Sequence, residues 1–168
     1  THERARMDYS GITHIHHFFL QRAGIALAFL WQKAQAHPDW RIRGMLLFFV
    51  EQAIWGFSVL NRYSPSHFSQ VNRALNGVYY VASQTAECSP QYNLGGKLER
   101  LVRAFQAYRT GPGMAVVNLG SAANLPLPPN SVDYVFTAPP FGENIYYADL
   151  NFLIESWHRV ATDAKPEA

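Results

Sequence analysis

The sequence lacks the features that would place it in a secreted, membrane or metal-binding class. Its single cysteine, Cys88, excludes an internal disulfide, and there is no Cys-x-x-Cys pair for zinc. No apolar run approaches the ~20 residues of a membrane span, and no basic-then-apolar signal segment is seen. His14, His16 and His17 have no suitably spaced carboxylate or cysteine beside them. We therefore expect a cytoplasmic protein without metal or membrane contact, with Cys88 as a buried, inert thiol.

Acidic residues are scarce in the first two thirds of the chain. Residues 1–112 hold 12 Lys/Arg and 6 Asp/Glu, whereas residues 113–168 hold 2 and 6. Eleven of the fourteen basic residues are Arg, whose guanidinium suits phosphate contact. Contact with nucleic acid and an ordinary charged surface on a helical half both fit this pattern. The first choice for phosphate contacts is Arg41 and Arg43, together with Arg62 and Arg73, which flank a polar stretch.

The apolar residues of the first part recur at helical spacing. They predict helices over 13–36, with Thr13 as N-cap, over 40–57 and over 94–108. The helix over 40–57 is apolar around most of its circumference, so we expect it to be buried on more than one side. The polar stretch 61–76 predicts a loop, and 77–82 predicts a short strand.

The last third of the chain has a different pattern. It predicts a strand over 114–119, a Pro-rich connection, a strand over 132–137 and a helix over 148–160. Strand, loop, strand, loop and helix in this order are typical of a doubly wound sheet. The sequence therefore predicts an α/β fold in two parts: a mainly helical, Arg-bearing segment over 1–112 and part of a sheet over 113–168.

The window Ala138-Pro139-Pro140-Phe141 is the most informative in the chain. It follows the strand-like run 131–137 and precedes Gly142-Glu-Asn-Ile-Tyr-Tyr-Ala-Asp-Leu-Asn151. Two prolines fix φ, so they predict a rigid corner at the carboxyl end of a strand, where open α/β sheets bind ligands. A plain Pro-Pro turn after an edge strand would have the same local sequence. The preceding stretch 118–137 favours the functional interpretation.

These residues closely resemble the (Asp/Asn/Ser)-Pro-Pro-(Tyr/Phe/Trp) motif of the DNA amino-methyltransferases. The loop after the motif is similar to an adenine-specific branch of that family, which often carries a zinc ribbon elsewhere in the chain. The resemblance is good over about 115–160. It implies a partial Rossmann-like methyltransferase sheet, S-adenosylmethionine as the cofactor, DNA as the partner and methyl transfer to the exocyclic amine of adenine. It also implies a fragment, in which the remainder of a longer chain completes the cofactor site.

The resemblance also gives individual residues a role. The prolines and the aromatic ring frame a base flipped out of the duplex, and the Ala138 carbonyl accepts a hydrogen bond from its amino group. The residues concerned are Ala138, Pro139, Pro140 and Phe141 at the base, Ser121 near the adenosine of the cofactor, and Asn144, Tyr146 and Tyr147 as further base contacts. A strand-end turn at Ser121, and tyrosines that pack the loop onto the next helix, remain open alternatives.

Two departures from the family pattern bear on activity. Ala138 occupies the position of the usual acceptor side chain, and the glycine-rich loop Phe-x-Gly-x-Gly is absent, since neither Gly95-Gly96 nor Gly111-Pro-Gly113 fits it. A catalytically degenerate DNA-binding or regulatory homologue is therefore an alternative. A methyltransferase that acts on cytosine, RNA or a protein amide is another.

Overall fold

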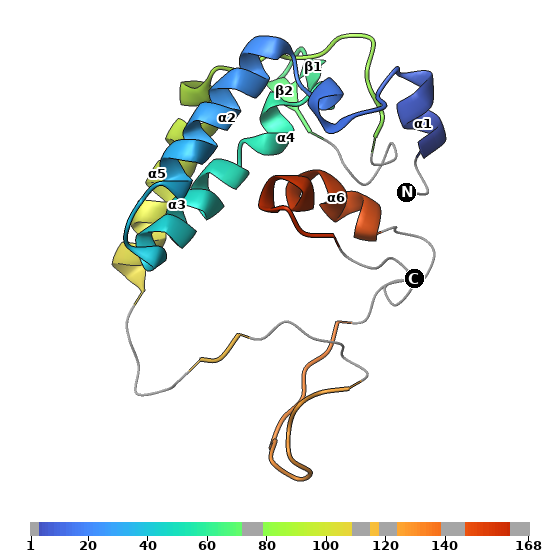
Figure 1. Cartoon of the computed structure of the whole chain (residues 1–168). Helices are drawn as coiled ribbons and strands as arrows, with labels where there is room; N and C mark the ends of the chain where they lie inside the picture. Colours follow the sequence, from blue (N-terminus) through green and yellow to red (C-terminus); the bar gives the residue numbers. More distant parts are fainter. Residues whose placement is uncertain (1–3, 72–78, 109–114, 118–123, 139–146, 162–168) are drawn as a thin grey trace.

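The structure is a computed structural model, and it describes residues 4–71, 79–108, 115–117, 124–138 and 147–161. It is a mixed fold in which about 54% of the described residues are helical and two short strands form an antiparallel sheet (Figure 1). In chain order the elements are α1 (Arg4–Tyr9), the 3-10 helix η1 (Ile15–Phe18), α2 (Gln21–Gln35), α3 (Trp40–Glu51), α4 (Ile54–Phe57), β1 (Arg62–Ser64), β2 (Phe68–Gln70), α5 (Pro90–Ala107) and α6 (Tyr147–His158).

Helices α2 and α3 lie side by side as a helical hairpin (Figure 1). Helix α2 buries Ala23, Leu27, Trp31 and Ala34, which recur at the spacing of one helical face. The prediction of one helix from a Thr13 cap is wrong in detail. The segment begins with η1, and α2 starts after Leu20, which makes no side-chain capping bond. An extended backbone at Phe19 and Leu20 separates the two helices.

Helix α3 ends earlier than its apolar pattern predicts. Asp39 caps its first turn by accepting hydrogen bonds from the backbone N–H groups of Arg41 at 2.8 Å and Ile42 at 3.2 Å. After Glu51 the helical bonding is interrupted, and α4 follows as a separate short turn whose residues are all buried. Burial on more than one side is true of α4 but not of α3, in which Val50 is the buried residue. Trp40, Ile42, Met45 and Phe48 of α3 are exposed.

The stretch expected to be a loop contains a β-hairpin. Strands β1 and β2 pair antiparallel with Arg62 opposite Gln70 and Ser64 opposite Phe68. The turn between them is three residues long and is followed by Phe68 in the left-handed region, with φ of 60°. A three-residue turn followed by a left-handed residue is a common hairpin connection, but glycine normally occupies that last position. Because Phe68 occupies this position, the sequence lacks the glycine that would predict the hairpin.

Three segments expected to be strands are not strands where the structure describes them. Residues 79–82 are irregular, and Tyr79 is fully buried and packs on Phe18, with ring centroids 5.4 Å apart. Residues 115–117 and 132–137 are irregular and exposed. A strand needs a neighbour for its backbone N–H and C=O groups, and no described strand pairs with either segment. Residues 124–138, orange in Figure 1, extend away from the helices.

Helix α5 begins at a strong cap. The Ser89 hydroxyl accepts a hydrogen bond from the Tyr92 N–H at 3.1 Å, and Pro90 occupies the first helical position. The apolar stripe predicted for 94–108 is present, but Leu94 is its buried member. Leu98, Val102 and Phe105 are 51%, 45% and 58% exposed, so the stripe remains largely uncovered by the described residues.

Helix α6 closes the core. Leu153 is fully buried with Leu27, Ile54 and Phe18 in one apolar cluster, and Trp157 lies edge-on to Phe19 with ring centroids 5.7 Å apart. The predicted helix over 148–160 is thus confirmed as α6, one residue earlier at its start and two earlier at its end. Among the described residues, none of the helices has the length and apolar character that a membrane crossing requires.

Candidate functional site

The described structure reaches both ends of the Pro-Pro-Phe window but not the window itself. Ala138 is exposed at the end of the segment 124–138, and Tyr147 is the first, half-buried residue of α6. Pro139, Pro140 and Phe141 lie outside the described residues. The further candidates Ser121, Asn144, Tyr146 and Arg73 also lie outside them.

Helix α6, which directly follows this window, is tied to the helical body at its first turn. The hydroxyl of the buried Tyr79 donates a hydrogen bond to the backbone carbonyl of Asp149 at 2.5 Å. The same Tyr79 ring contacts Phe152, with centroids 6.5 Å apart. The start of α6 is therefore held by a residue almost seventy positions earlier in the chain, and Tyr147 is held with it.

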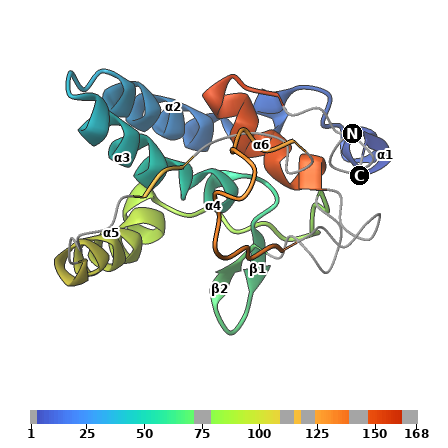
Figure 2. The ribbon, with the colours of Figure 1, turned by 90° about the horizontal axis from the view of Figure 1, so that it is seen from below.

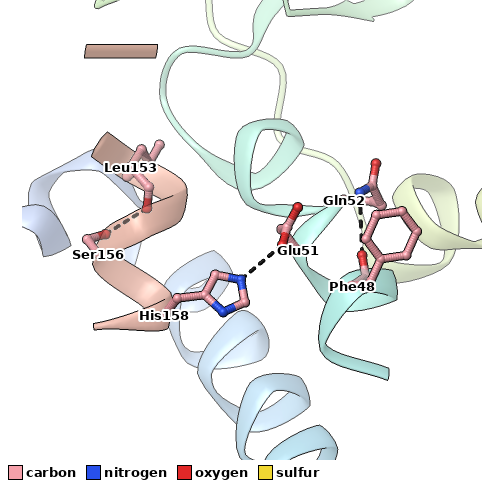
Figure 3. A network of polar contacts seen from close by, with 6 residues as sticks. All are labelled: Phe48, Glu51, Gln52, Leu153, Ser156 and His158. Carbon is pink, nitrogen blue, oxygen red and sulfur yellow. Dashed lines mark hydrogen bonds and ion pairs between the residues drawn. The ribbon is translucent and has the colours of Figure 1, made fainter. Parts of the chain in front are cut away.

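The other end of α6 is fixed by a polar and an aromatic contact with two helices. His158 Nε2 lies 2.9 Å from Glu51 Oε2 at the end of α3 (Figure 3). The His158 ring also packs against Trp31 of α2, with centroids 4.9 Å apart. Ser156 donates to the Leu153 carbonyl at 2.6 Å, which closes a local bond within the helix. Because both ends of α6 are fixed, Tyr147, the first described residue after the window, belongs to a helix that is held by the body.

The arginines predicted to contact phosphate lie in two separate places. Arg41 is exposed on the first turn of α3 and its guanidinium lies 5.3 Å from the Trp40 ring centroid, and Arg43 donates to the His37 carbonyl at 3.3 Å. Arg62 is half-buried on β1 and donates from Nη2 to Gln70 Oε1 at 2.9 Å. Helix α3 rises about 18 Å along its length at about 1.5 Å per residue, and it separates the first turn from the hairpin. The three predicted arginines that the structure describes, Arg41, Arg43 and Arg62, do not form one surface.

A polar hollow of about 530 Å³ lies between the end of α3, α4, β2 and α5. The polar side chains that line it include Glu51, Ser69, Tyr92, Asn93, Lys97 and Arg100. Lys97 Nζ donates to the backbone carbonyl of Gln52, and Arg100 is exposed at the rim. The Asn93 Nδ2 atom is buried without a hydrogen-bond partner among the described residues. Two cations and an amide donor suit an anionic group.

This hollow is not among the sites predicted from the sequence. Its α5 side is formed by Asn93, Gly96, Lys97 and Arg100, which recur at three- and four-residue intervals and therefore share one face of the helix. That spacing is visible in the sequence, opposite the apolar stripe of the same helix. What the sequence does not reveal is that Gly96 leaves the space open, since nothing lies within 4 Å of a Cβ built there.

The histidines and the cysteine do not form a metal site. Within the described part of the chain, no group of three or more His, Cys, Asp or Glu side chains is arranged to hold a metal ion. His14 and His17 instead share the Thr13 hydroxyl, at 2.9 Å and 3.4 Å from their Nδ1 atoms. Cys88 is buried as expected, and its Sγ accepts from Asn61 Nδ2 at 3.3 Å.

A separate ion pair joins the start of α2 to the segment before α5. The Arg22 guanidinium donates two hydrogen bonds to the Glu87 carboxylate. These bonds lower the pKa of Glu87, since they favour the charged carboxylate; the Coulombic attraction of Arg22 adds to this and partial desolvation opposes it. The same bonds raise the pKa of Arg22. Side-chain exposure is 82% for Arg22, so we regard the pair as a surface clamp.

Comparisons with protein-family models, with curated proteins and with solved structures find no match for this chain. The residues of the chain are therefore the basis for assigning a function.

Proposed function

We propose that this chain is part of an S-adenosylmethionine-dependent DNA amino-methyltransferase that acts on adenine. The observation that carries the proposal is the window Ala138-Pro139-Pro140-Phe141 with its extended flanks over 118–137 and 142–151. Diproline followed by an aromatic ring supplies a stiff frame with a flat face for a base flipped from the duplex. The exposure of Ala138 at the near end of the window supports this role, because a base must reach it from solvent.

In this proposal each residue of the window has a defined task. Phe141 stacks on the flipped base, while Pro139 and Pro140 fix the backbone so that no conformational entropy is lost when the base binds. The backbone carbonyl of Ala138 accepts a hydrogen bond from the amino group. Tyr147, in the first turn of α6, is the proposed further base contact, and this turn is held by the Tyr79–Asp149 bond.

The described residues do not offer a site that fits the cofactor. S-adenosylmethionine would supply the methyl group, but the Phe-x-Gly-x-Gly loop is missing from the sequence and Ser121 lies outside the described residues. We propose that another part of a longer protein supplies this loop and the neighbouring strands of a Rossmann-like sheet. The exposure of Val117 (98%), Val135 (68%) and Phe136 (82%) supports this, since β-branched and aromatic residues favour strands once a neighbour is present.

A second function is favoured by one residue. Ala138 has no side-chain acceptor, and removing a hydrogen bond made in the transition state typically costs about 10²–10³ in rate, by analogy with an oxyanion donor. A homologue that binds DNA without methylating it would tolerate this loss. The two functions differ in whether any product forms, so a product assay separates them.

The test measures methylated nucleosides in DNA from a host that has no adenine methylation of its own. The longer protein that contains this chain is expressed there, and the digested DNA is analysed by mass spectrometry. We expect N6-methyldeoxyadenosine, a further increase with Ala138→Asp, and a loss of about 10-fold with Phe141→Ala because stacking on the base is lost. Phe29→Ala, which removes an exposed ring of α2 outside the window, is the control and should retain activity.

Other outcomes have a definite meaning. No methylated product with either the native chain or Ala138→Asp contradicts the enzyme and leaves the DNA-binding alternative. A methyl group on cytosine, on RNA or on a protein amide keeps the transferase and changes its substrate.

A further inference from the structure

Three exposed aromatic rings lie in a row where the hairpin meets α5. Tyr63 of β1, Phe68 of β2 and Tyr92 of α5 are 44%, 46% and 54% exposed. The ring centroids of Tyr63 and Phe68 are 6.2 Å apart with their planes at 85°, and those of Phe68 and Tyr92 are 5.5 Å apart with their planes at 77°, so successive rings meet edge to face. The row, here called the aromatic platform, lies on the hairpin that stands out from the helices in Figure 2.

Phe68 adopts a backbone conformation that its side chain does not favour. Its φ of 60° is in the left-handed region, where a residue with a Cβ loses about 1–2 kcal/mol relative to the right-handed region. Regular pairing opposite Ser64 would place the Phe68 ring on the strand face away from Tyr63, because side chains alternate along a strand. The left-handed residue breaks this alternation, and the ring contacts Tyr63 instead.

The turn itself does not require a phenylalanine at position 68. Glycine would adopt the same φ without strain, and the half-exposed ring recovers only part of its burial energy. Strained residues with exposed side chains occur preferentially at functional sites. The chain therefore keeps an aromatic ring at a costly position on its surface, in line with two more rings.

The platform is continuous with the polar hollow. Tyr92 belongs to both, and it also ties the hairpin to α5 by donating from its hydroxyl to the His67 carbonyl at 3.3 Å. Lys97 and Arg100 line the hollow on the same helix. Tyr92 and Arg100 are about 12 Å apart along the helix axis at about 1.5 Å per residue.

We propose that the aromatic platform stacks unpaired nucleic-acid bases while Lys97 and Arg100 receive the phosphates of the same strand. Aromatic rings beside a cationic groove are the combination by which proteins hold single strands without reading their sequence. This inference goes beyond the methyl-transfer proposal and does not rest on it, because none of these residues belongs to the Pro-Pro-Phe window. It assigns a strand-binding surface on the hairpin side of the helices.

The test is the affinity of the purified chain for a fluorescently labelled dT15 oligonucleotide, measured by anisotropy. Thymine has no exocyclic amine, so this probe cannot be a methyl acceptor, and the platform variants below separate binding at the platform from binding elsewhere on the chain. We expect the chain to bind dT15 more tightly than a duplex of the same length. Phe68→Gly and Tyr63→Ala should each weaken binding about 10-fold, as expected for the loss of one stacked base.

Phe68→Gly also separates binding from folding. Because glycine relieves the left-handed strain, its thermal unfolding midpoint should stay equal to that of the native chain or rise. A structural role for the ring predicts the opposite, a lower midpoint. Phe29→Ala on α2 is the matched control, since Phe29 is 57% exposed and lies outside the platform; its affinity for dT15 should not change.

The contribution of the cations is read from salt dependence. Arg100→Gln should reduce the slope of log affinity against log salt by about 0.7, the value for one contact to a single strand. Three results would overturn the proposal: no binding of dT15, equal losses in Phe68→Gly and Phe29→Ala, or full competition by a polyanion that has no bases. Methylated adenine with an unaffected Phe68→Gly variant would reject the platform only, whereas dT15 binding without any methylation would reject the enzyme only.

Discussion

Gly56 of α4 lies directly against the Asn93 side chain of α5. A Cβ built there would lie 2.1 Å from Asn93 Oδ1 and 2.8 Å from Asn93 Cγ. Both distances are shorter than a real contact, so a methyl group at position 56 would have to displace the Asn93 side chain. Because Asn93 also lines the polar hollow, that displacement would change the hollow's wall.

We expect Gly56→Ala to lower the free energy of unfolding by about 1–3 kcal/mol through overpacking. Gly96→Ala is the control, because its Cβ meets nothing within 4 Å; it should raise stability by up to about 1 kcal/mol, as alanine does for glycine within a helix. Urea unfolding of both variants measures the difference. Combining Gly56→Ala with Asn93→Ala should recover part of the loss, and strictly additive effects would contradict the clash.

The Arg22–Glu87 pair makes a prediction about acid stability. Since the folded chain lowers the pKa of Glu87, its contribution to stability is present above the ordinary value of 4.5. It is lost as the pH falls below 4.5 through the lowered pKa of the folded state, because the unfolded chain takes up the proton first. Glu87→Gln should therefore flatten the fall of the unfolding temperature in this acid range.

Calorimetry or circular dichroism between neutral and acid pH would measure that slope. Glu99→Gln is the matched control, because Glu99 is 72% exposed and lies 3.8 Å from Arg103 in an i,i+4 pair. If both substitutions flatten the curve equally, the Arg22–Glu87 pair contributes no more to acid stability than the exposed Glu99–Arg103 pair.

At the scale of the elements, capping explains where the best-predicted helices begin. Asp39 and Ser89 each precede a helix and accept hydrogen bonds from its first N–H groups. The periodicity of α5 and α6 is also readable from the sequence, and both helices are present within a few residues of their predicted bounds. These features are local, so the sequence carries them in full.

Asp39→Ala should lower stability by about 1 kcal/mol, because two N–H groups of α3 lose their acceptor. Asp39→Asn should retain most of the native stability, since asparagine is a comparable cap. Chemical denaturation of the three proteins tests this order. An Asn variant as unstable as the Ala variant would mean that the negative charge at the helix start, rather than the hydrogen bonds, carries the effect.

The elements that the sequence predicted wrongly depend on distant partners or on strain. The hairpin was missed because Phe68 occupies the glycine position of its turn. The strand predicted over 132–137 has a suitable apolar pattern, but no described strand pairs with it. Similarly, the apolar pattern of α3 predicted burial that α2 provides on one side only. Of the candidate site, the sequence named the window and four arginines (Arg41, Arg43, Arg62 and Arg73), but not the hollow or its cations Lys97 and Arg100.

At the scale of the whole molecule, the described residues form a helical body and one exposed extension. The core collects buried residues from η1, α2, α4 and α6, and residues 124–138 contribute none of them. All residues of 124–138 are exposed and irregular. Proteases cleave extended, exposed backbone far more readily than helices of equal exposure.

Limited digestion with chymotrypsin should therefore cut after Tyr134 or Phe136 before it cuts α5. Tyr92 and Phe105 are the internal control, because they are 54% and 58% exposed but helical. Mass spectrometry of the earliest fragments identifies the sites. Cleavage within α5 at the same rate would mean that α5 opens as easily as the extension.

The chain leaves the body at the end of α5 and returns at the start of α6, about forty residues later. Helix α6 is secured through Tyr79 and Glu51 to the body itself. For a connection of this length, ten added residues would raise the free-energy cost of closing the loop by only about a few tenths of a kcal/mol. The stability of the helical body should therefore depend little on the length of the connection between α5 and α6. A foreign domain inserted into this connection should leave the helices folded.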